Sequence, residues 1–192
     1  MSGDLLRHVE AHLIQHLGPV SARASVTFVG TETFDVLRFD QDEYDVTRYV
    51  TLGMSRHPMS PSDSFVVDGD GPRAELILSL RERRDEVTRA LAILAASPAV
   101  EGVVVSAGAS LALGEPLWPG AGFEAVLVGE SGGHIPDLST DAAEPVRFFP
   151  LLPMTNTEAA WKRVHGAAAL EERWLIQGTD LRDPQRTAVS LA

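Results

Sequence analysis

The sequence predicts an α+β fold, a single domain with a mixed, largely antiparallel sheet and helices packed against it. Three observations lead to this class. Short β-type segments follow one another directly after an N-terminal helix, one helical segment interrupts the strands in the middle, and helical segments end the chain. A doubly wound, nucleotide-binding sheet requires regular alternation of strands and helices, which this sequence lacks.

Length and composition define the expected domain. The chain has 192 residues, of which 44% are hydrophobic and 22% charged, as in an ordinary globular domain. We expect one domain over residues 1–178, with a helix at 4–17 and a core over about 25–177, and a C-terminal tail over 179–192. The chain contains no cysteine, which excludes disulfides, thiolate metal sites, iron–sulfur clusters and thiol nucleophiles.

The charge balance narrows the classes of partner. Sixteen basic and 27 acidic residues give a formal net charge of −11. Such a surface repels phosphate backbones and anionic lipids, so we expect no nucleic-acid and no membrane partner. The sequence shows no apolar stretch of the roughly 20 residues that cross a bilayer, and no signal peptide. We therefore expect a cytoplasmic protein whose acidity favours solubility or a basic protein partner.

The first half of the chain predicts one helix and three strands. The helix spans Asp4–Leu17, because Leu5, Val9 and Leu13 recur every four residues on one face and Gly18 ends it. Residues 57–71 contain two prolines and an Asp-Gly-Asp-Gly turn and predict a loop. The predicted strands, rich in β-branched and aromatic residues, are Ser25–Val29, Phe34–Phe39 and Val46–Leu52.

The second half predicts a strand and helix, further strands, and two closing helices. Ala74–Leu80 is a strand, and the helix after it should end at Ser97 because Pro98 follows. Thr155 and Glu158 match a capping box, and the residues after Gly178 form a loosely held tail. The remaining predicted elements are strands over Gly102–Ser106, Phe123–Val128 and Val146–Leu152 and helices over Ala159–His165 and Ala167–Gln177.

A few residues are candidates for catalysis or metal binding. His8, His12 and His16 lie four residues apart on the first helix, but no glutamate completes a zinc-binding His-Glu-x-x-His pattern, so we interpret them as solvent-facing. Ser55 and His57 follow a strand, but the glycine expected two residues after a nucleophilic serine is missing, which favours a turn role. We therefore expect no catalytic set, no metal site and no cofactor.

Acidic clusters provide the candidate binding residues. Six acids and one arginine lie between Glu32 and Asp45, and four further acids lie between Glu130 and Glu144. A cationic partner could dock on such surfaces, although a solvated acidic loop is the simpler interpretation. The candidate partner-binding residues, from the first cluster and the turn that follows the next strand, are Asp40, Asp42, Glu43, Asp45, Met54, Ser55 and His57.

Several segments, taken in order, resemble the suppressor of fused domain family. The resemblance extends from about the first strand to about Gln177 and implies a domain that is not known as an enzyme. Animal members bind transcription factors of the Hedgehog pathway and carry a further domain for which this chain has no room, and some bacterial relatives resemble toxin immunity proteins. The segments that carry the resemblance are Val46–Ser55, His57–Met59, Ala74–Leu78, Gly114–Leu117, Phe123–Val128 and Phe148–Thr155 with Glu158 behind it.

Three functions are consistent with the sequence. The first is a non-enzymatic, bacterial protein-binding module, and in its sharper form an immunity protein that neutralises a basic toxin domain by electrostatic capture. The second is a hydrolase or small-molecule-binding enzyme with a site near Ser55 and His57 or at the N-terminal histidines. The third is a structural or regulatory domain without a link to toxins.

Overall fold

Seven strands form one open, mixed sheet in the order β1-β2-β3-β4-β7-β6-β5 within the described residues. The structure is a computed structural model of the whole chain and describes residues 2–40, 42–64, 68–141 and 144–192. Its α+β class and its mixed, mainly antiparallel sheet are as predicted. The elements in chain order are α1 (Ser2–Leu17), β1 (Ala22–Thr27), β2 (Thr33–Phe39), β3 (Thr47–Leu52), the 3₁₀ turn η1 (Met54–Arg56), β4 (Arg73–Leu80), α2 (Val87–Glu101), β5 (Ser110–Ala112), β6 (Ala125–Val128), β7 (Val146–Met154), α3 (Asn156–His165) and α4 (Ala167–Ile176).

One parallel pair makes the sheet mixed. β1 to β4 form an antiparallel meander, and β5, β6 and β7 form a second antiparallel group. β7 pairs with β4 in parallel, with Ala74 opposite Arg147. This is possible because α2 and the β5–β6 segment return the chain to the end of the sheet at which β4 begins. The sheet therefore has β1 and β5 at its edges and β4 and β7 in its middle.

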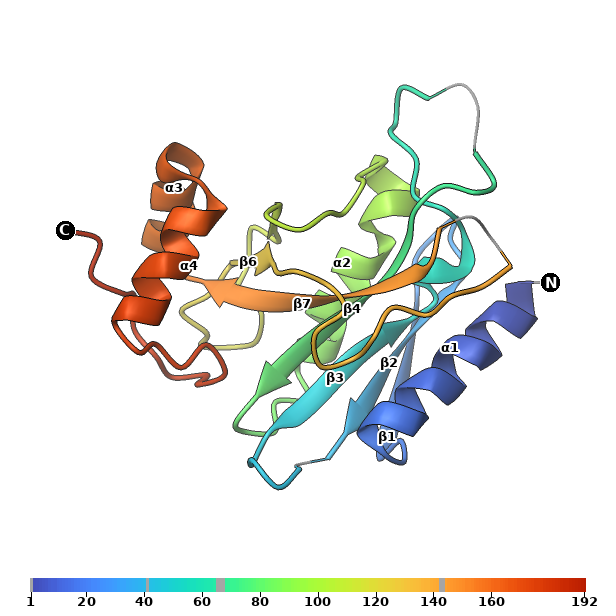
Figure 1. Cartoon of the computed structure of the whole chain (residues 1–192), viewed down its shortest axis with the longest axis horizontal. Coiled ribbons are helices and arrows are strands. Elements are labelled where there is room, and N and C mark those ends of the chain that lie inside the picture. Colours follow the sequence, from blue (N-terminus) through green and yellow to red (C-terminus); the bar gives the residue numbers. More distant parts are fainter. Residues whose placement is uncertain (1, 41, 65–67, 142–143) are drawn as a thin grey trace.

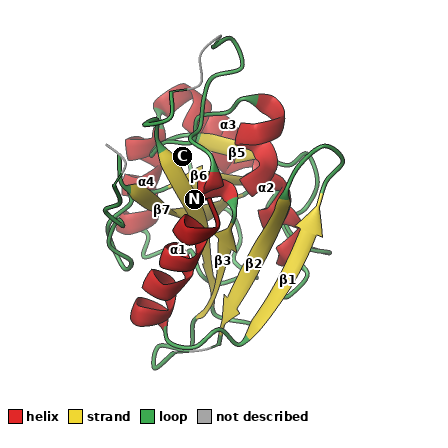
Figure 2. Ribbon diagram, turned by 90° about the vertical axis from the view of Figure 1, so that its right-hand side faces the viewer, coloured by secondary structure: helices red, strands yellow, loops and turns green. Residues whose placement is uncertain are grey.

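Helices cover both faces of the meander, as Figure 2 shows for α1 and α2. The apolar face of α1, including Val9 and Leu13, packs with Leu37 and Phe148 on one side of the sheet. Most of α2 is apolar and packs on the other side, against strand residues such as Leu76. Strand residues of β4 are buried on both faces, because each face of this central strand lies under a helix.

The C-terminal helices form a third packed unit beside β6 and β7. Leu170 and Trp174 of α4 are buried against Leu127 and Met154. The capping box predicted for Thr155 and Glu158 is present at the start of α3. Segment 179–192 contains no helix or strand, but it is less loosely held than predicted, because Leu181, Val189 and Leu191 pack into this unit.

Two predictions about the middle of the chain are wrong. Residues 102–106, predicted as a strand, form a loop in which the amide of Val105 donates to Sδ of Met59 instead of to a neighbouring strand. The short strand β5 lies a few residues later, where no strand was predicted. The helix predicted to end at Ser97 continues through Pro98 to Glu101.

The ends of some strands also differ from the prediction. β1 begins at Ala22 and ends at Thr27, earlier than the predicted strand over 25–29. Val29 is fully exposed in the loop after it, so its β-branched side chain does not indicate a strand position. β1 is an edge strand with mostly exposed side chains, which weakens the alternation on which its prediction rests.

Candidate functional site

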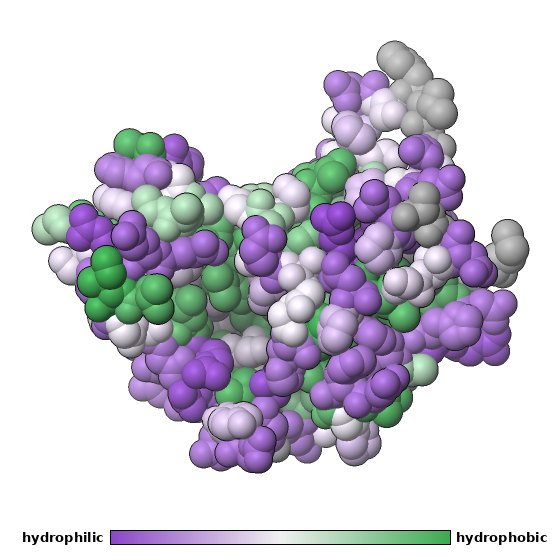
Figure 3. Space-filling view, viewed as in Figure 1, coloured by the Kyte–Doolittle hydropathy of each residue, from purple (hydrophilic) through white to green (hydrophobic). Residues whose placement is uncertain are grey.

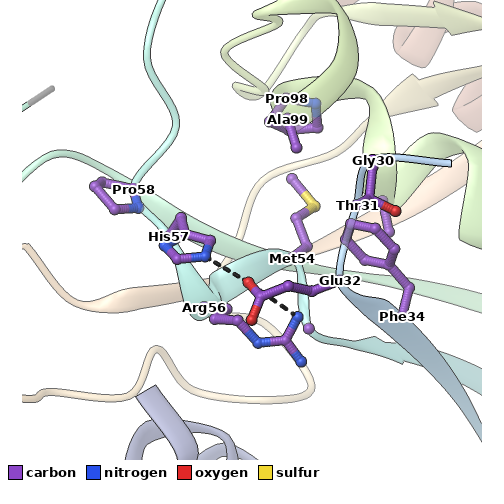
Figure 4. A pocket seen from close by; sticks show the side chains of 12 residues that line it. Gly30, Thr31, Glu32, Phe34, Met54, Arg56, His57, Pro58, Pro98 and Ala99 are labelled. Atoms are coloured by element: carbon purple, nitrogen blue, oxygen red, sulfur yellow. Dashed lines mark hydrogen bonds and ion pairs between the residues drawn. The ribbon is translucent and has the colours of Figure 1, made fainter. Parts of the chain in front are cut away.

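A hollow of about 220 Å³ lies where three parts of the chain meet. Its walls are the turn after β3, the loop between β1 and β2, and the C-terminal part of α2 (Figure 4). We call this hollow the turn pocket. The turn pocket contains the predicted site residues Met54 and His57, whereas a second hollow lies over β1, β2 and β3 near Tyr49 and contains none of them.

The turn pocket has an apolar floor and a charged rim. Phe34 and Met54 are buried and form the floor. On the rim, Nε2 of His57 lies 2.6 Å from Oε2 of Glu32, and a guanidinium nitrogen of Arg56 lies 3.6 Å from the same oxygen (Figure 4). The hydrogen bond with His57 lowers the pKa of the Glu32 carboxyl, so this side chain is ionised at neutral pH.

The backbone of the turn depends on Gly53. Its φ of 135° lies in a region that side-chain-bearing residues rarely adopt. A Cβ atom at this position would lie 3.2 Å from the carbonyl oxygen of Thr33, on the neighbouring strand β2. The absence of a side chain therefore allows β3 to turn sharply against β2 and to enter η1.

A buried carboxylate lies beneath the turn. Glu75 on β4 is 0% exposed. Its Oε1 accepts hydrogen bonds from the amides of Gly53 at 2.8 Å and Ser55 at 3.0 Å and from the Ser55 hydroxyl at 2.6 Å, and its Oε2 accepts from the Thr51 hydroxyl at 2.6 Å. Burial raises the pKa of Glu75, against the opposing effect of these hydrogen bonds.

Sequence reasoning missed Glu75, although a signal for it existed. It is the single charged residue in the strand predicted over Ala74–Leu80, whose other residues are apolar except for Ser79. Fully buried acids are rare, and those that occur are engaged by hydrogen-bond donors or cations. The pattern alone did not identify which donors would satisfy this group.

The predicted serine and histidine have different partners. The Ser55 hydroxyl is completely buried and donates to Glu75. His57 is 68% exposed and contacts Glu32 on the rim. The described contacts therefore contain no serine–histidine pair of the kind that activates a nucleophile. Of the candidate binding residues in this turn, His57 faces solvent, while Met54 and Ser55 support the turn from below.

The predicted acidic residues lie at the other end of β3, in the turn that joins it to β2 (Figure 1). We call residues 40 and 42–45 the acidic turn. Although burial opposes it, hydrogen bonds from Arg48 and from the amides of Tyr44 and Val46 lower the pKa of the Asp42 carboxyl. Asp42 thus organises the turn, rather than serving as a free surface charge.

The other members of the acidic turn are exposed, and among them Asp40 accepts a hydrogen bond from Nε of Arg38 at 2.9 Å. Glu43 and Asp45 are exposed, and Tyr44 between them is 62% exposed. Asp45 has a φ of 56°, and it is the one non-glycine residue with positive φ among those described. The lower edge of the molecule, where this turn lies, is largely hydrophilic in Figure 3. The candidate binding residues therefore occupy two separate patches, one at each end of β3.

The N-terminal histidines have structural contacts. Nε2 of His12 lies 2.7 Å from the carbonyl oxygen of Pro136, and its ring stacks on Phe148. Nδ1 of His16 lies 2.9 Å from the carbonyl oxygen of His12, while His8 is exposed. In the described ranges, no group of three or more histidine, aspartate or glutamate residues is placed to hold a metal ion. None of the helices described there is long and apolar enough to cross a membrane.

This α+β arrangement is a fold found in solved structures. A suppressor of fused homolog from Neisseria gonorrhoeae aligns with a TM-score of 0.70 and 21% identity over 98% of each chain. A chain of the Sufu–Fu complex aligns with a TM-score of 0.69 and 12% identity, over 96% of this chain and 91% of that one. Drosophila Suppressor of Fused aligns with a TM-score of 0.66 and 11% identity, over 96% of this chain and 50% of that one.

The sequence itself identifies the family. The sequence model of the suppressor of fused protein (SUFU) family matches residues 30–187, which is most of the chain. The protein therefore belongs to the SUFU family, as the motif resemblance predicted. A search of the curated proteins finds no match to the sequence.

Proposed function

We propose that this protein is a binding module for another protein, and that the acidic turn contacts a basic partner. The observation that carries the proposal is membership of the SUFU family together with the fold it shares with a chain solved in the Sufu–Fu complex. The net charge of −11 favours a partner whose contacting surface is positively charged.

The geometry of the acidic turn supports this role. Asp42 holds the backbone in place through the amides of Tyr44 and Val46, so the exposed Glu43 and Asp45 project from an ordered turn. An exposed tyrosine between carboxylates provides apolar contact area at low conformational cost. Long-range attraction would accelerate the encounter with a basic surface, and the ordered turn reduces the entropy lost on binding.

The sharper form of the proposal is toxin immunity. In this form the protein captures a basic bacterial toxin domain, such as a nuclease, and blocks its active surface in the cytoplasm. A toxin gene next to the gene for this protein would support it, and co-expression should then protect cells from that toxin. If the toxin still harms cells that contain a stoichiometric amount of this protein, the immunity proposal is rejected, whereas the broader proposal of protein binding is not.

The first test is affinity capture from the native host with a matched pair of variants. The D40K/E43K variant reverses two charges in the acidic turn, and E171K/E172K reverses two exposed charges on α4, so both change the net charge equally. We expect D40K/E43K to slow association with the captured partner by roughly tenfold or more at low salt. The control should change it far less. Equal effects of the two variants would show that overall charge, not the acidic turn, determines binding.

The enzyme alternative receives no comparable support from the geometry. Its proposed serine is buried against Glu75, and its proposed histidine contacts Glu32. The turn pocket contains one carboxylate and two basic side chains, not a nucleophile beside a base.

A further inference from the structure

Glu75 joins the turn pocket to the centre of the sheet. Its two oxygens accept four hydrogen bonds from β3 and from the turn that follows it. These donors are two backbone amides and two hydroxyls, so none of them carries a charge. When it is ionised, the carboxylate therefore carries its negative charge inside the protein and these four contacts oppose that charge with dipoles only.

The carboxylate also replaces missing strand pairing. The β3–β4 ladder ends at Val50 opposite Ile77. Beyond that pair, the Thr51 hydroxyl accepts from the amide of Leu76 at 2.8 Å and donates to Glu75. On the β4 side, contacts centred on this carboxylate therefore guide the chain from Thr51 into the turn, while Thr51 and Leu52 remain paired with β2 on the other side.

A buried charge of this kind is costly, and a neutral side chain would avoid the cost. Transfer of an ionised carboxylate out of water is unfavourable unless strong interactions compensate for it. Burial is the dominant influence on Glu75 and raises its pKa. The ionised group is therefore poor as a source of stability, but it accepts hydrogen bonds more strongly than a neutral oxygen does.

We propose that Glu75 positions the turn pocket: its ionised carboxylate holds the Gly53–His57 turn, and protonation of its Oε2 loosens that turn. This inference concerns the unbound protein and goes beyond the proposed binding function. It makes the geometry of Arg56 and His57 on the rim dependent on a group that neither of them touches directly.

The hydrogen-bond geometry specifies where the proton is added. Oε1 already accepts three bonds, whereas Oε2 accepts one, from a hydroxyl that can rotate. A proton on Oε2 points at Thr51 Oγ1. The Thr51 hydroxyl can then no longer donate to Oε2, and it must rotate so that its hydrogen points to another acceptor. The three bonds to Oε1 change from charge-assisted to neutral, which is about a halving of their strength.

Other charged groups lie on the elements packed around the turn, and several of them have partners of their own. Arg73, on the same strand as Glu75, donates to the carbonyl oxygens of Ser55 and Arg56, so it also secures the turn. The charged and titratable side chains on the remaining packed elements are Glu32, Arg56 and His57 at the rim; Arg48 on β3, paired with Asp42; Arg147 on β7, paired with Glu144; Arg89 and Glu101 on α2; and Asp4, Arg7, His8, Glu10, His12 and His16 on α1.

The methionines offer a direct test. The chain contains four, so methyl-¹³C labelling gives few signals, which Met-to-Leu variants assign. Met54 lies in the turn, whereas Met154 lies in the core beside α4 and serves as the internal control. We expect the Met54 methyl signal to shift with pH through a single transition above the ordinary glutamate range of about 4.3. The Met154 signal should not follow it.

Glu75→Gln mimics the protonated side chain and tests whether Glu75 is the group whose titration shifts the Met54 signal. In this variant, the Met54 signal should stay at its acid-limit position at every pH. The amides of Gly53 and Ser55 should exchange roughly tenfold faster than in the wild type at pH values above the wild-type transition. His57→Gln should retain the transition. A transition that persists in Glu75→Gln or vanishes in His57→Gln would overturn the proposal, as would a flat wild-type profile.

A second variant covers the case in which Glu75→Gln does not fold. Ser55→Ala removes one of the hydroxyl donors to Glu75 but keeps the backbone amide. The carboxylate then loses a stabilising partner, so the Met54 transition should move to higher pH. An unchanged midpoint would contradict the proposal. Because these measurements need no partner, they remain decisive even if the proposed binding function fails.

Discussion

Gly53 is the single residue on which the sharp turn between β3 and η1 depends most directly. Its backbone conformation is strained for any residue with a side chain, and its missing Cβ faces the backbone of β2. The same residue donates its amide to Glu75. One position thus combines a conformational requirement with a close approach between strands.

We expect Gly53→Ala to lower the free energy of unfolding by about 1–3 kcal/mol, because the backbone must adopt a disfavoured φ and the new methyl group crowds Thr33. Gly133→Ala is the control, since its φ is not in the left-handed region and nothing lies near its Cβ position. Urea denaturation of both variants measures the difference. Equal stability of the two would show that the turn can relax without cost.

At the scale of elements, α2 shows how a helix accommodates an internal proline. Pro98 has no N–H, so the carbonyl of Leu94, four residues earlier, loses its helical donor. The Ser97 hydroxyl donates to that carbonyl at 2.8 Å and takes the place of the missing amide. The helix can therefore continue to Glu101, and its last turns form one wall of the turn pocket.

This compensation predicts coupling between neighbouring residues. Ser97→Ala should lower the free energy of unfolding by about 1–2 kcal/mol, because it leaves a buried carbonyl without a donor. In a Pro98→Ala background, the restored amide satisfies Leu94, so the same substitution should cost much less. A double-mutant cycle in urea measures the coupling. An identical cost in both backgrounds would exclude this role for Ser97.

The middle of the chain shows where local pattern misleads. Val103, Val104 and Val105 have the composition of a strand, but they belong to no strand within the described residues. Val105 instead contacts Met59 of the long loop. β5 is only three residues long and too short for alternation to identify it. Strand composition predicts a strand only where the fold provides a neighbour.

At the scale of the whole molecule, one buried ion pair joins the C-terminal segment to the third packed unit. Glu158 accepts hydrogen bonds from Arg186, Trp174 and the amides of Thr155 and Val189. Burial alone would raise its pKa, but the hydrogen bonds, with that from Arg186 the strongest, lower it. Both side chains are nearly inaccessible, so the pair anchors residues 179–192 from within.

The lowered pKa determines how this contribution depends on pH. Because the folded carboxyl is more acidic than the unfolded one, the pair stabilises the protein fully above the ordinary value of 4.5 and loses its effect as the pH falls through the folded pKa. Glu158→Gln should destabilise the protein by about 3–5 kcal/mol at neutral pH, since Arg186 is left without its counter-charge. Thermal unfolding measured from neutral to acidic pH should show that the stability difference between Glu158→Gln and the wild type shrinks as the pH falls below 4.5. Glu171→Gln, on the exposed face of α4, is the control, and a pH-independent difference would contradict the assignment.

Local sequence pattern establishes much of the secondary structure. The four-residue repeat of α1, the cores of β2, β3 and β4, and the capping box at Thr155 and Glu158 each follow from residues close together in the chain. Composition and the order of elements also indicate the α+β class, and the ordered motifs indicate the family. These properties depend on periodicity, backbone preference and short-range hydrogen bonds, all of which are determined by residues close together in the sequence.

Only the packed chain determines how these elements combine into a site. The parallel pairing of β4 with β7, the burial of Glu75 beneath the turn, and the contact of Arg186 with Glu158 each join residues far apart in sequence. The structure also places the acidic turn and His57 at opposite ends of β3, although both belong to one predicted set. Such relations follow from which surfaces are buried together, and a buried charge acquires its partners only when the chain closes around it.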